Sequence, residues 1–417
     1  MLRYLIMITE GLLTTAILLG LLYAYTAETC GKRGRLIFAI GSLAGAVGAG
    51  VMSVMKNTTS LVVTGIWNLR IFTTCTVALI LLIVFSAKGI RRKLGNAGDV
   101  IVSVLTAVLG CMFLFYALPD VYAYPFNFSL NGDSMFSTAF LYRFLGYILG
   151  LILIVVTFLA IEKSARRMGK GGRKGLLLAA LAVNAAQQIA KIIQTLVARR
   201  YIKSNHVLFT IVKYSSNYSN FFIYAIVLLA LAVPVALWIR SLHVKEPYEN
   251  PAQRRKIRAK WRNTRRWATT AAVCFGLGIL IVTAVDAYAN RAVELSPVED
   301  SEVRDGAVYV PLEQVEDGHL HRFAYTTDDN ITVRFIVIKK PNSSAYGVGL
   351  DACDICGETG YYERDEQIVC KLCDVVMNVN TIGFKGGCNP IVIDYSVGDG
   401  YIIVPTETLV EHQNEFK

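Results

Sequence analysis

Residues 4–25 read YLIMITEGLLTTAILLGLLYAY and decide the class of this 417-residue chain. The run is apolar apart from Glu10 and three threonines, and a helix of about 20 such residues crosses a bilayer. Seven further blocks of this kind follow at about 36–55, 61–86, 99–118, 139–161, 175–197, 218–239 and 267–288. The sequence therefore predicts a polytopic α-helical membrane protein with about eight transmembrane helices.

Charges in the connections between these blocks predict the orientation of the helices. Lys and Arg gather in the first, third, fifth and seventh connections, and the seventh, 241–266, alone carries nine. The second and fourth connections hold only Lys56 between them. Because basic loops stay in the cytoplasm, we expect both termini to be extracytoplasmic. The sixth connection departs from this pattern, and either it lies along the outer lipid surface or its predicted ends are misplaced. Its cations are Arg199, Arg200, Lys203 and Lys213.

Charge and composition change together near residue 290. Up to residue 291 the chain has 33 Lys and Arg against 9 Asp and Glu, and afterwards it has 9 against 22. We therefore expect a transmembrane helical domain over 1–290 and an extracytoplasmic, metal-binding domain over 291–417. The basic excess lies in short loops that orient helices, and the acidic tail would repel a polyanion. Membrane lipid, and not nucleic acid, is the expected contact.

The tail has the composition of a small β-rich domain. Runs of β-branched and aromatic residues predict strands, and Gly and Asn clusters separate the runs. The predicted strands lie at 307–312, 331–338, 391–395 and 401–404. We expect these strands to hold the loops that contain the cysteines.

Five cysteines crowd into 36 residues of the tail: Cys353, Cys356, Cys370, Cys373 and Cys388. The first four form two C-x-x-C pairs, a spacing that lets both thiolates of one turn bind the same ion. Two such turns supply four sulfurs in a tetrahedral arrangement. Three interpretations remain open, namely a structural zinc site, an iron or iron–sulfur centre, and disulfides with one thiol left over. The other four cysteines lie singly in or beside membrane helices, where they suit packing.

The residues around these cysteines resemble a known family. The resemblance rests on Asp351-Ala352-Cys353-Asp354-Ile355-Cys356-Gly357, Gly360-Tyr361, Cys370-x-x-Cys373, Met377-Asn378, Thr381-Ile382-Gly383 and Gly386-Gly387-Cys388-Asn389-Pro390. Across about 318–395 the chain is similar to the FtrD-like membrane iron–sulfur protein family. The resemblance implies a bacterial inner-membrane protein that works with an iron permease, a periplasmic iron-binding protein and a copper-containing oxidase. It also implies that the metal centre transfers electrons.

His319 and His321 form an H-x-H pair just before a predicted strand. Alternation along a strand would put both imidazoles on one face, where they could bind a second metal or complete the cysteine site. The pair is equally consistent with two histidines that are simply exposed at the surface. The sequence alone does not bring them to the cysteines.

Ionisable and polar groups inside the membrane indicate function by default, because the bilayer penalises them. Glu10 lies in Thr9-Glu10-Gly11-Leu12, which resembles the Arg-Glu-Gly-Leu-Glu motif of iron permeases without its arginine and second glutamate. Glu10 is therefore a candidate metal ligand or an interfacial residue. The sixth helix carries one polar stripe, which suits either hydrogen bonds between helices or a cavity for an ion or a quinone headgroup. The stripe comprises Asn184, Gln187, Gln188, Lys191 and Gln194.

Two functions are consistent with these features. The first is a membrane-anchored electron-transfer component of an iron-uptake system, rather than a stand-alone enzyme. The second is a transporter or permease accessory in which the cysteines hold structural zinc, while Glu10 and the polar stripe of the sixth helix line an ion pathway. No predicted membrane helix contains histidine, so a haem held by two histidines is excluded, and a quinone or a partner would have to carry electrons.

Overall fold

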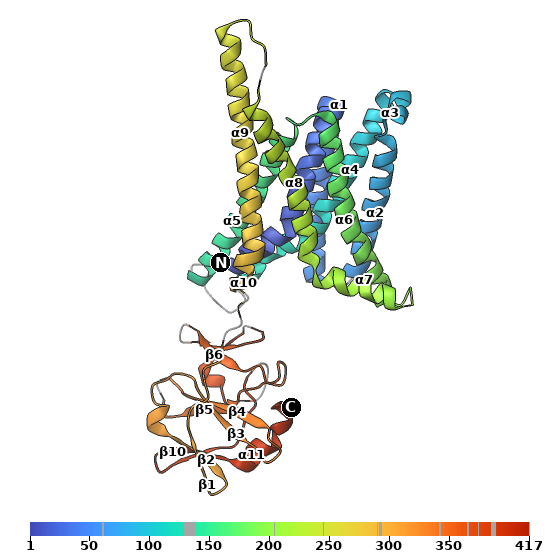
Figure 1. Ribbon diagram of the computed structural model, residues 1–417. Helices are drawn as coiled ribbons and strands as arrows, with labels where there is room; N and C mark the ends of the chain where they lie inside the picture. Colours follow the sequence, from blue (N-terminus) through green and yellow to red (C-terminus); the bar gives the residue numbers. More distant parts are fainter. Residues whose placement is uncertain are drawn as a thin grey trace. The chain divides into compact units, whose positions relative to one another are not determined.

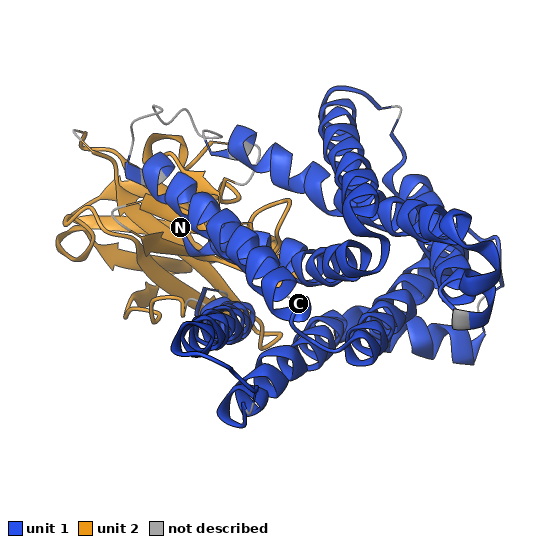
Figure 2. Ribbon diagram, turned by 90° about the horizontal axis from the view of Figure 1, so that it is seen from above, with its two compact units in different colours: residues 1–290 blue, residues 291–417 orange. Residues whose placement is uncertain are grey.

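The computed structural model describes residues 1–60, 62–128, 138–203, 205–244, 246–289, 291, 294–341, 343–364, 367–373, 375–384 and 389–416. Contacts divide the chain into a helical unit, residues 1–290, and a tail unit, residues 291–417 (Figure 2).

Helices build the first unit, and most of them are long and apolar. In chain order they are α1 (Leu2–Thr58), α2 (Thr64–Phe85), α3 (Lys88–Leu94), α4 (Asn96–Ala123), α5 (Thr138–Ala165), α6 (Lys170–Ala198), α7 (His206–Asn217), α8 (Ser219–Leu242), α9 (Pro251–Leu280) and, after a π-helical turn, α10 (Asp286–Ala289). Seven helical segments in the described chain are long and apolar enough to cross a membrane. This confirms the predicted class, a multi-pass membrane protein.

The first of these helices is two crossing segments joined at Gly31. Gly31 has φ 66° and ψ −148°, a conformation that breaks the helix and reverses the chain. The rings of Tyr23 and Phe38 lie 5.6 Å apart, although 15 residues of continuous helix would separate them by about 22 Å. Counting α1 twice gives eight crossing segments in the described chain, the number that the apolar blocks predict.

Small residues let the second half of α1 pack closely on α4. A Cβ atom added to Gly45 would lie 2.3 Å from the carbonyl oxygen of Cys111, and one added to Gly41 would lie 2.8 Å from Ala107. Glycines four residues apart commonly permit such close approach between membrane helices. Interhelical packing in this unit therefore depends on glycine as well as on large apolar side chains.

The two ends of the helical unit differ in charge. The short basic helix α3 and the arginine-rich start of α9 lie at one end, and α7 and α10 lie at the other (Figure 1). We call the first the basic end. Helix α7 belongs to the sixth connection and exposes Val207, Phe209 and Tyr214. Such a face suits the lipid surface, as the first of the two alternatives for this connection proposes.

The tail unit consists of three small antiparallel sheets. The first has the order β1 (Glu302–Arg304), β2 (Ala307–Pro311), β10 (Tyr401–Pro405) and β9 (Ser396–Gly398). The second has β3 (His321–Thr326), β4 (Thr332–Lys339) and β5 (Tyr346–Leu350), and the third has β6 (Tyr361–Arg364), β7 (Gln367–Cys370) and β8 (Val376–Met377). A short helix, α11 (Thr406–Glu411), follows β10. The prediction of a small β-rich domain is confirmed.

One predicted strand is wrong. Residues 391–395 are extended but join no sheet. Among the described residues, the backbone pairing of this run is limited to Ile391, which accepts from Leu350 N–H at 2.8 Å and donates to the Ala352 carbonyl at 3.0 Å. Pro390 has no N–H to extend this pairing, and the chain beyond Ala352 turns into the first cysteine loop. Residues 391–395 therefore have no partner strand among the described residues, although their composition is that of a strand.

Candidate metal centre

The first cysteine pair lies on a tight turn that begins just after β5. Cys353 and Gly357 exchange two backbone hydrogen bonds, of 3.2 and 2.9 Å. Gly357 has a φ of 65°, which a residue without a Cβ adopts readily. Within the turn, Cys356 N–H donates to the Sγ of Cys353 at 3.1 Å. The local backbone thus points an amide at a sulfur, which stabilises a thiolate there.

The second pair begins at the end of the β6–β7 hairpin. Cys370 is the last residue of β7, where it pairs with Tyr361, and its N–H donates to the carbonyl of Val375 at 3.0 Å. The backbone N–H groups of Leu372 and Cys373 bond the side chain of Cys370. Both C-x-x-C turns therefore present backbone amides to the sulfur of their first cysteine.

The two turns bring their sulfurs together. The Sγ atoms of Cys356, Cys370 and Cys373 all lie within 4.8 Å of one another, and the thiol of Cys356 also contacts that of Cys353. Cys353 and Cys370 are buried, Cys356 is half-buried and Cys373 is exposed. Burial and then the neighbouring thiols raise the pKa of Cys356. A bound cation would oppose this effect, because it favours the thiolate form.

The donor set fits one thiophilic ion. Sulfurs at about 2.3 Å from a tetrahedral ion lie about 3.8 Å from each other, within the separation found for the three sulfurs. A polynuclear cluster attaches thiolates to different irons and so holds them farther apart. Iron and zinc both accept four sulfurs, whereas magnesium and calcium prefer oxygen. Cys388 lies outside the described residues and takes no part in this comparison.

A buried ion pair anchors the first turn. Asp351 is fully buried, and its Oδ2 accepts from Arg322 Nε at 2.8 Å while its Oδ1 accepts from Tyr361 N–H at 2.8 Å. Arg322 also donates to the carbonyl of Tyr361. Asp351 thereby joins the end of β5 to β3 and β6. The sequence signal for this partner is Arg322, a charge inside an apolar strand.

Comparisons with known proteins agree with a metal site in the tail. Residues 315–416 match the model of the family described as membrane iron-sulfur containing protein FtrD-like. The resemblance that rests on the residues around the cysteines is therefore confirmed for this segment. The FtrD-like segment contains both C-x-x-C turns, the Arg322–Asp351 pair and most of the tail strands. No curated protein and no solved structure matches the chain.

Within the FtrD-like segment, the two histidines face carboxylates. The Nδ1 of His319 lies 2.9 Å from Glu363. His321 is buried, with Nδ1 3.0 Å from Glu299 and Nε2 2.8 Å from Asp317. Burial lowers the pKa of His321, but the two carboxylates outweigh burial and raise it. The arrangement suits an imidazolium between two acids, and the cluster of sulfurs found among the described residues includes neither histidine.

The polar groups of the membrane helices have partners of their own. Glu10 on α1 faces the side chain of Asn220 on α8 and lies near Asp286 on α10. In the stripe of α6, Lys191 donates to the hydroxyl of Tyr116 at 2.9 Å, and Gln188 faces Cys75. The stripe thus faces α2 and α4, as hydrogen bonding between helices predicts.

Proposed function

We propose that this chain is a membrane-anchored electron-transfer component of a bacterial iron-uptake system. Its redox group is iron held by Cys353, Cys356, Cys370 and Cys373. The convergence of three of these sulfurs within 4.8 Å carries the proposal, because it supplies a site that only a thiophilic ion fits. Thiolate-bound iron exchanges single electrons between its ferrous and ferric forms.

The surface around the sulfurs supports electron transfer over a purely structural role. Cys373 is exposed, and Ile355 and Leu372, the apolar residues inside the two C-x-x-C turns, are 69% and 64% exposed. A structural zinc site has no need of exposed apolar side chains at its rim. Small interfaces with short-lived contacts are typical of redox partners, and an apolar rim beside an accessible sulfur suits them.

The partners follow from the proposed location. An extracytoplasmic tail would exchange electrons with a periplasmic iron-binding protein or a copper-containing oxidase, while the helices would lie in the bacterial inner membrane beside an iron permease. The acidic tail, with 22 Asp and Glu against 9 Lys and Arg after residue 291, would attract a basic partner or cations. Electrons that cross the membrane would need a bound quinone or another protein.

Metal analysis of the purified full-length chain tests the proposal. We expect iron, a visible absorption that bleaches on reduction, and a paramagnetic resonance signal in one redox state. The Cys30→Ser variant is the matched control, because Cys30 is a thiol in the helical unit and should leave these signals intact. A colourless chain that holds only zinc would contradict the electron-transfer proposal.

A second function, a transporter or permease accessory, has one observation in its favour. Glu10 lies near Asn220 and Asp286, which come from two other helices, and α10, which carries Asp286, lies at the end of the helical unit opposite the basic end (Figure 1). Two carboxylates and an amide are ligands that divalent cations accept. If this function is the right one, Glu10→Gln will abolish iron uptake while the tail keeps its metal, and unchanged uptake would contradict it.

A further inference from the structure

A hollow of about 880 Å³ lies at the basic end of the helical unit, among the cations of the connection 241–266. It is formed between the end of α8, the connection that follows it and the first four turns of α9. Arginines on one side of α9 dominate its lining. They are Arg254, Arg255, Arg258, Arg262 and Arg265.

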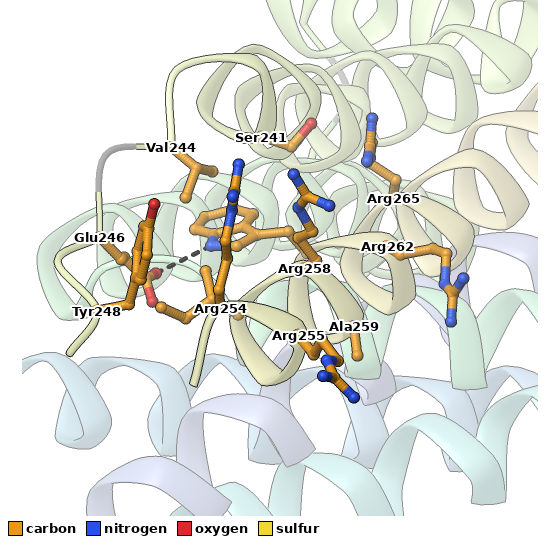
Figure 3. A pocket seen from close by; sticks show the side chains of 12 residues that line it. Ser241, Val244, Glu246, Tyr248, Arg254, Arg255, Arg258, Ala259, Arg262 and Arg265 are labelled. Atoms are coloured by element: carbon orange, nitrogen blue, oxygen red, sulfur yellow. Dashed lines mark hydrogen bonds between the residues drawn. The ribbon is translucent and has the colours of Figure 1, made fainter. Parts of the chain in front are cut away.

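These arginines share one side of the helix because their spacing follows the helical repeat. Arg254 and Arg258 extend together toward Ser241 and Val244, and Arg262 lies farther along the same helix (Figure 3). Arg254 also lies over the ring of Tyr248, with its guanidinium 5.4 Å from the ring centre. Positive charge from about four turns of α9 therefore faces the connection that follows α8.

Almost no negative charge offsets the arginines. Among the described residues of the lining, the one carboxylate is Glu246, which accepts from Lys260 Nζ at 3.0 Å and from Trp261 Nε1 at 2.9 Å. Figure 3 draws the second of these bonds. In the described part of the chain, no ion pair joins any of the five arginines to an acid. The guanidinium fork binds phosphate oxygens in pairs, so a phosphate-bearing ligand is the complementary partner.

A second hollow, of about 680 Å³, adjoins the first and lies against the apolar part of α9. Arg262 and Arg265 line both hollows. Beyond them the second hollow is lined mainly by apolar and small side chains of α5, α8 and α9. These include Val156, Trp238, Val273 and Cys274. Trp238 and Val273 are 41% and 53% exposed on the outer face of the helical unit.

The position of the basic hollow beside an apolar one decides the class of ligand. A soluble anion would fill the arginine hollow and leave the apolar groove unused, whereas a phospholipid has a phosphate and an acyl chain in the same order. Basic loops orient membrane helices whatever their shape, so orientation alone does not require arginines around one hollow that opens into a groove. Clusters of basic residues beside a membrane helix are a recognised binding feature for acidic lipids.

We propose that the arginine hollow and the adjoining groove form a binding site for an anionic phospholipid. The phosphate group lies against Arg258, Arg262 and Arg265, and an acyl chain follows Val156 and Val273. Because five arginines exceed the charge of one phosphate, a lipid with two phosphates binds more tightly than one with a single phosphate.

Native mass spectrometry of the full-length protein in detergent tests this site with three probes: phosphatidylcholine, phosphatidylglycerol and the diphosphate lipid cardiolipin. The wild-type protein is expected to retain cardiolipin most strongly and phosphatidylcholine least. The triple variant Arg258→Gln, Arg262→Gln, Arg265→Gln should bind anionic lipid about a hundredfold more weakly, at about fivefold for each basic residue removed. Lysine at the same three positions should restore part of the affinity, since charge remains but the fork is lost.

Arg92→Gln is the matched control, because Arg92 is an exposed arginine on the basic helix α3 and lines neither hollow. Equal lipid retention by this control and the triple variant would overturn the proposal. Soluble glycerol phosphate and inorganic triphosphate provide a further arm. Weak competition by both supports a lipid, whereas full displacement of lipid by triphosphate at matched concentration would assign the hollow to a soluble polyphosphate and overturn the lipid site.

Discussion

Arg322 and Asp351 form an ion pair in which both side chains are buried, with Nε 2.8 Å from Oδ2. Asp351 stands two residues before Cys353 and so connects the packing of the tail to the geometry of its metal site. Arg334 approaches the same carboxylate at 3.3 Å. A buried pair of this kind contributes little net stability over an apolar substitute, but removing one partner leaves a buried charge alone.

The Asp351→Asn variant should therefore destabilise the tail strongly. The amide keeps the shape of the carboxylate but leaves the charge of Arg322 buried, which costs about 3–5 kcal/mol. Urea unfolding, followed through metal release, measures the effect. Asp354→Asn makes the same change at an exposed position of the neighbouring turn and should be nearly neutral. Similar midpoints for the two variants would show that the ion pair does not support the site.

Removing one sulfur should empty the metal centre. Changes to groups that only support metal ligands lower affinity by about 10–100-fold, so Cys370→Ser, which removes a buried ligand, should do at least as much. Metal content after dialysis against a chelator measures this loss. The Cys388→Ser variant distinguishes two possible ligand sets. If the variant keeps its metal, the four cysteines of the C-x-x-C turns are the ligands. If the variant loses its metal, Cys388 is one of the ligands.

His321 should make the stability of the tail depend on pH. The pKa of His321 is raised because Asp317 and Glu299 outweigh burial. The protonated side chain therefore contributes stability that is fully present below its unfolded value of about 6.5 and is lost as pH rises through the folded pKa. A charged hydrogen bond contributes about 1.5–3 kcal/mol. We expect the unfolding free energy to fall by about that amount across this window.

The His321→Gln variant should lack this part of the pH dependence while it unfolds more easily in acid. His206→Gln is the control, since His206 is an exposed residue of the helical unit and its removal should leave the pH profile of the tail unchanged. Urea titrations at a series of pH values from 5.5 to 9 would decide the matter. Parallel profiles for the wild-type protein and the His321→Gln variant would contradict the interpretation.

The helices and the cysteine site were predictable because their signals are local. A bilayer imposes one length on every crossing segment, so apolar runs alone identified eight, including the pair that Gly31 joins. A C-x-x-C turn fixes its own geometry within five residues. By contrast, the two carboxylates that contact His321 belong to Glu299 and Asp317, and they reach the imidazole only when β3 packs against the preceding chain. No periodicity marks such partners.

The same distinction explains the strand that was wrongly predicted. Residues 391–395 have the composition of a strand, but a strand also needs a neighbour with free backbone groups. In the part of the chain that the structure describes, Leu350 and Ala352 alone offer such groups, and they offer them to Ile391. Composition describes the segment itself, and pairing depends on a distant part of the chain that the local pattern does not include.

Replacing Gly31 by alanine should weaken the helical unit without removing any contact. The φ of 66° and ψ of −148° lie in a region that is nearly restricted to glycine, and a side chain there costs about 1–3 kcal/mol. A Cβ at Gly31 would meet nothing within 4 Å, so the loss would come from the backbone alone. Gly276→Ala is the control, because Gly276 lies in α9 in equally open space, where alanine favours the helix. Thermal unfolding in detergent should place the midpoint of Gly31→Ala below that of the wild-type protein and that of Gly276→Ala at or above it. Equal midpoints for the two variants would mean that the reversal between the first two crossing segments does not depend on the conformation of Gly31.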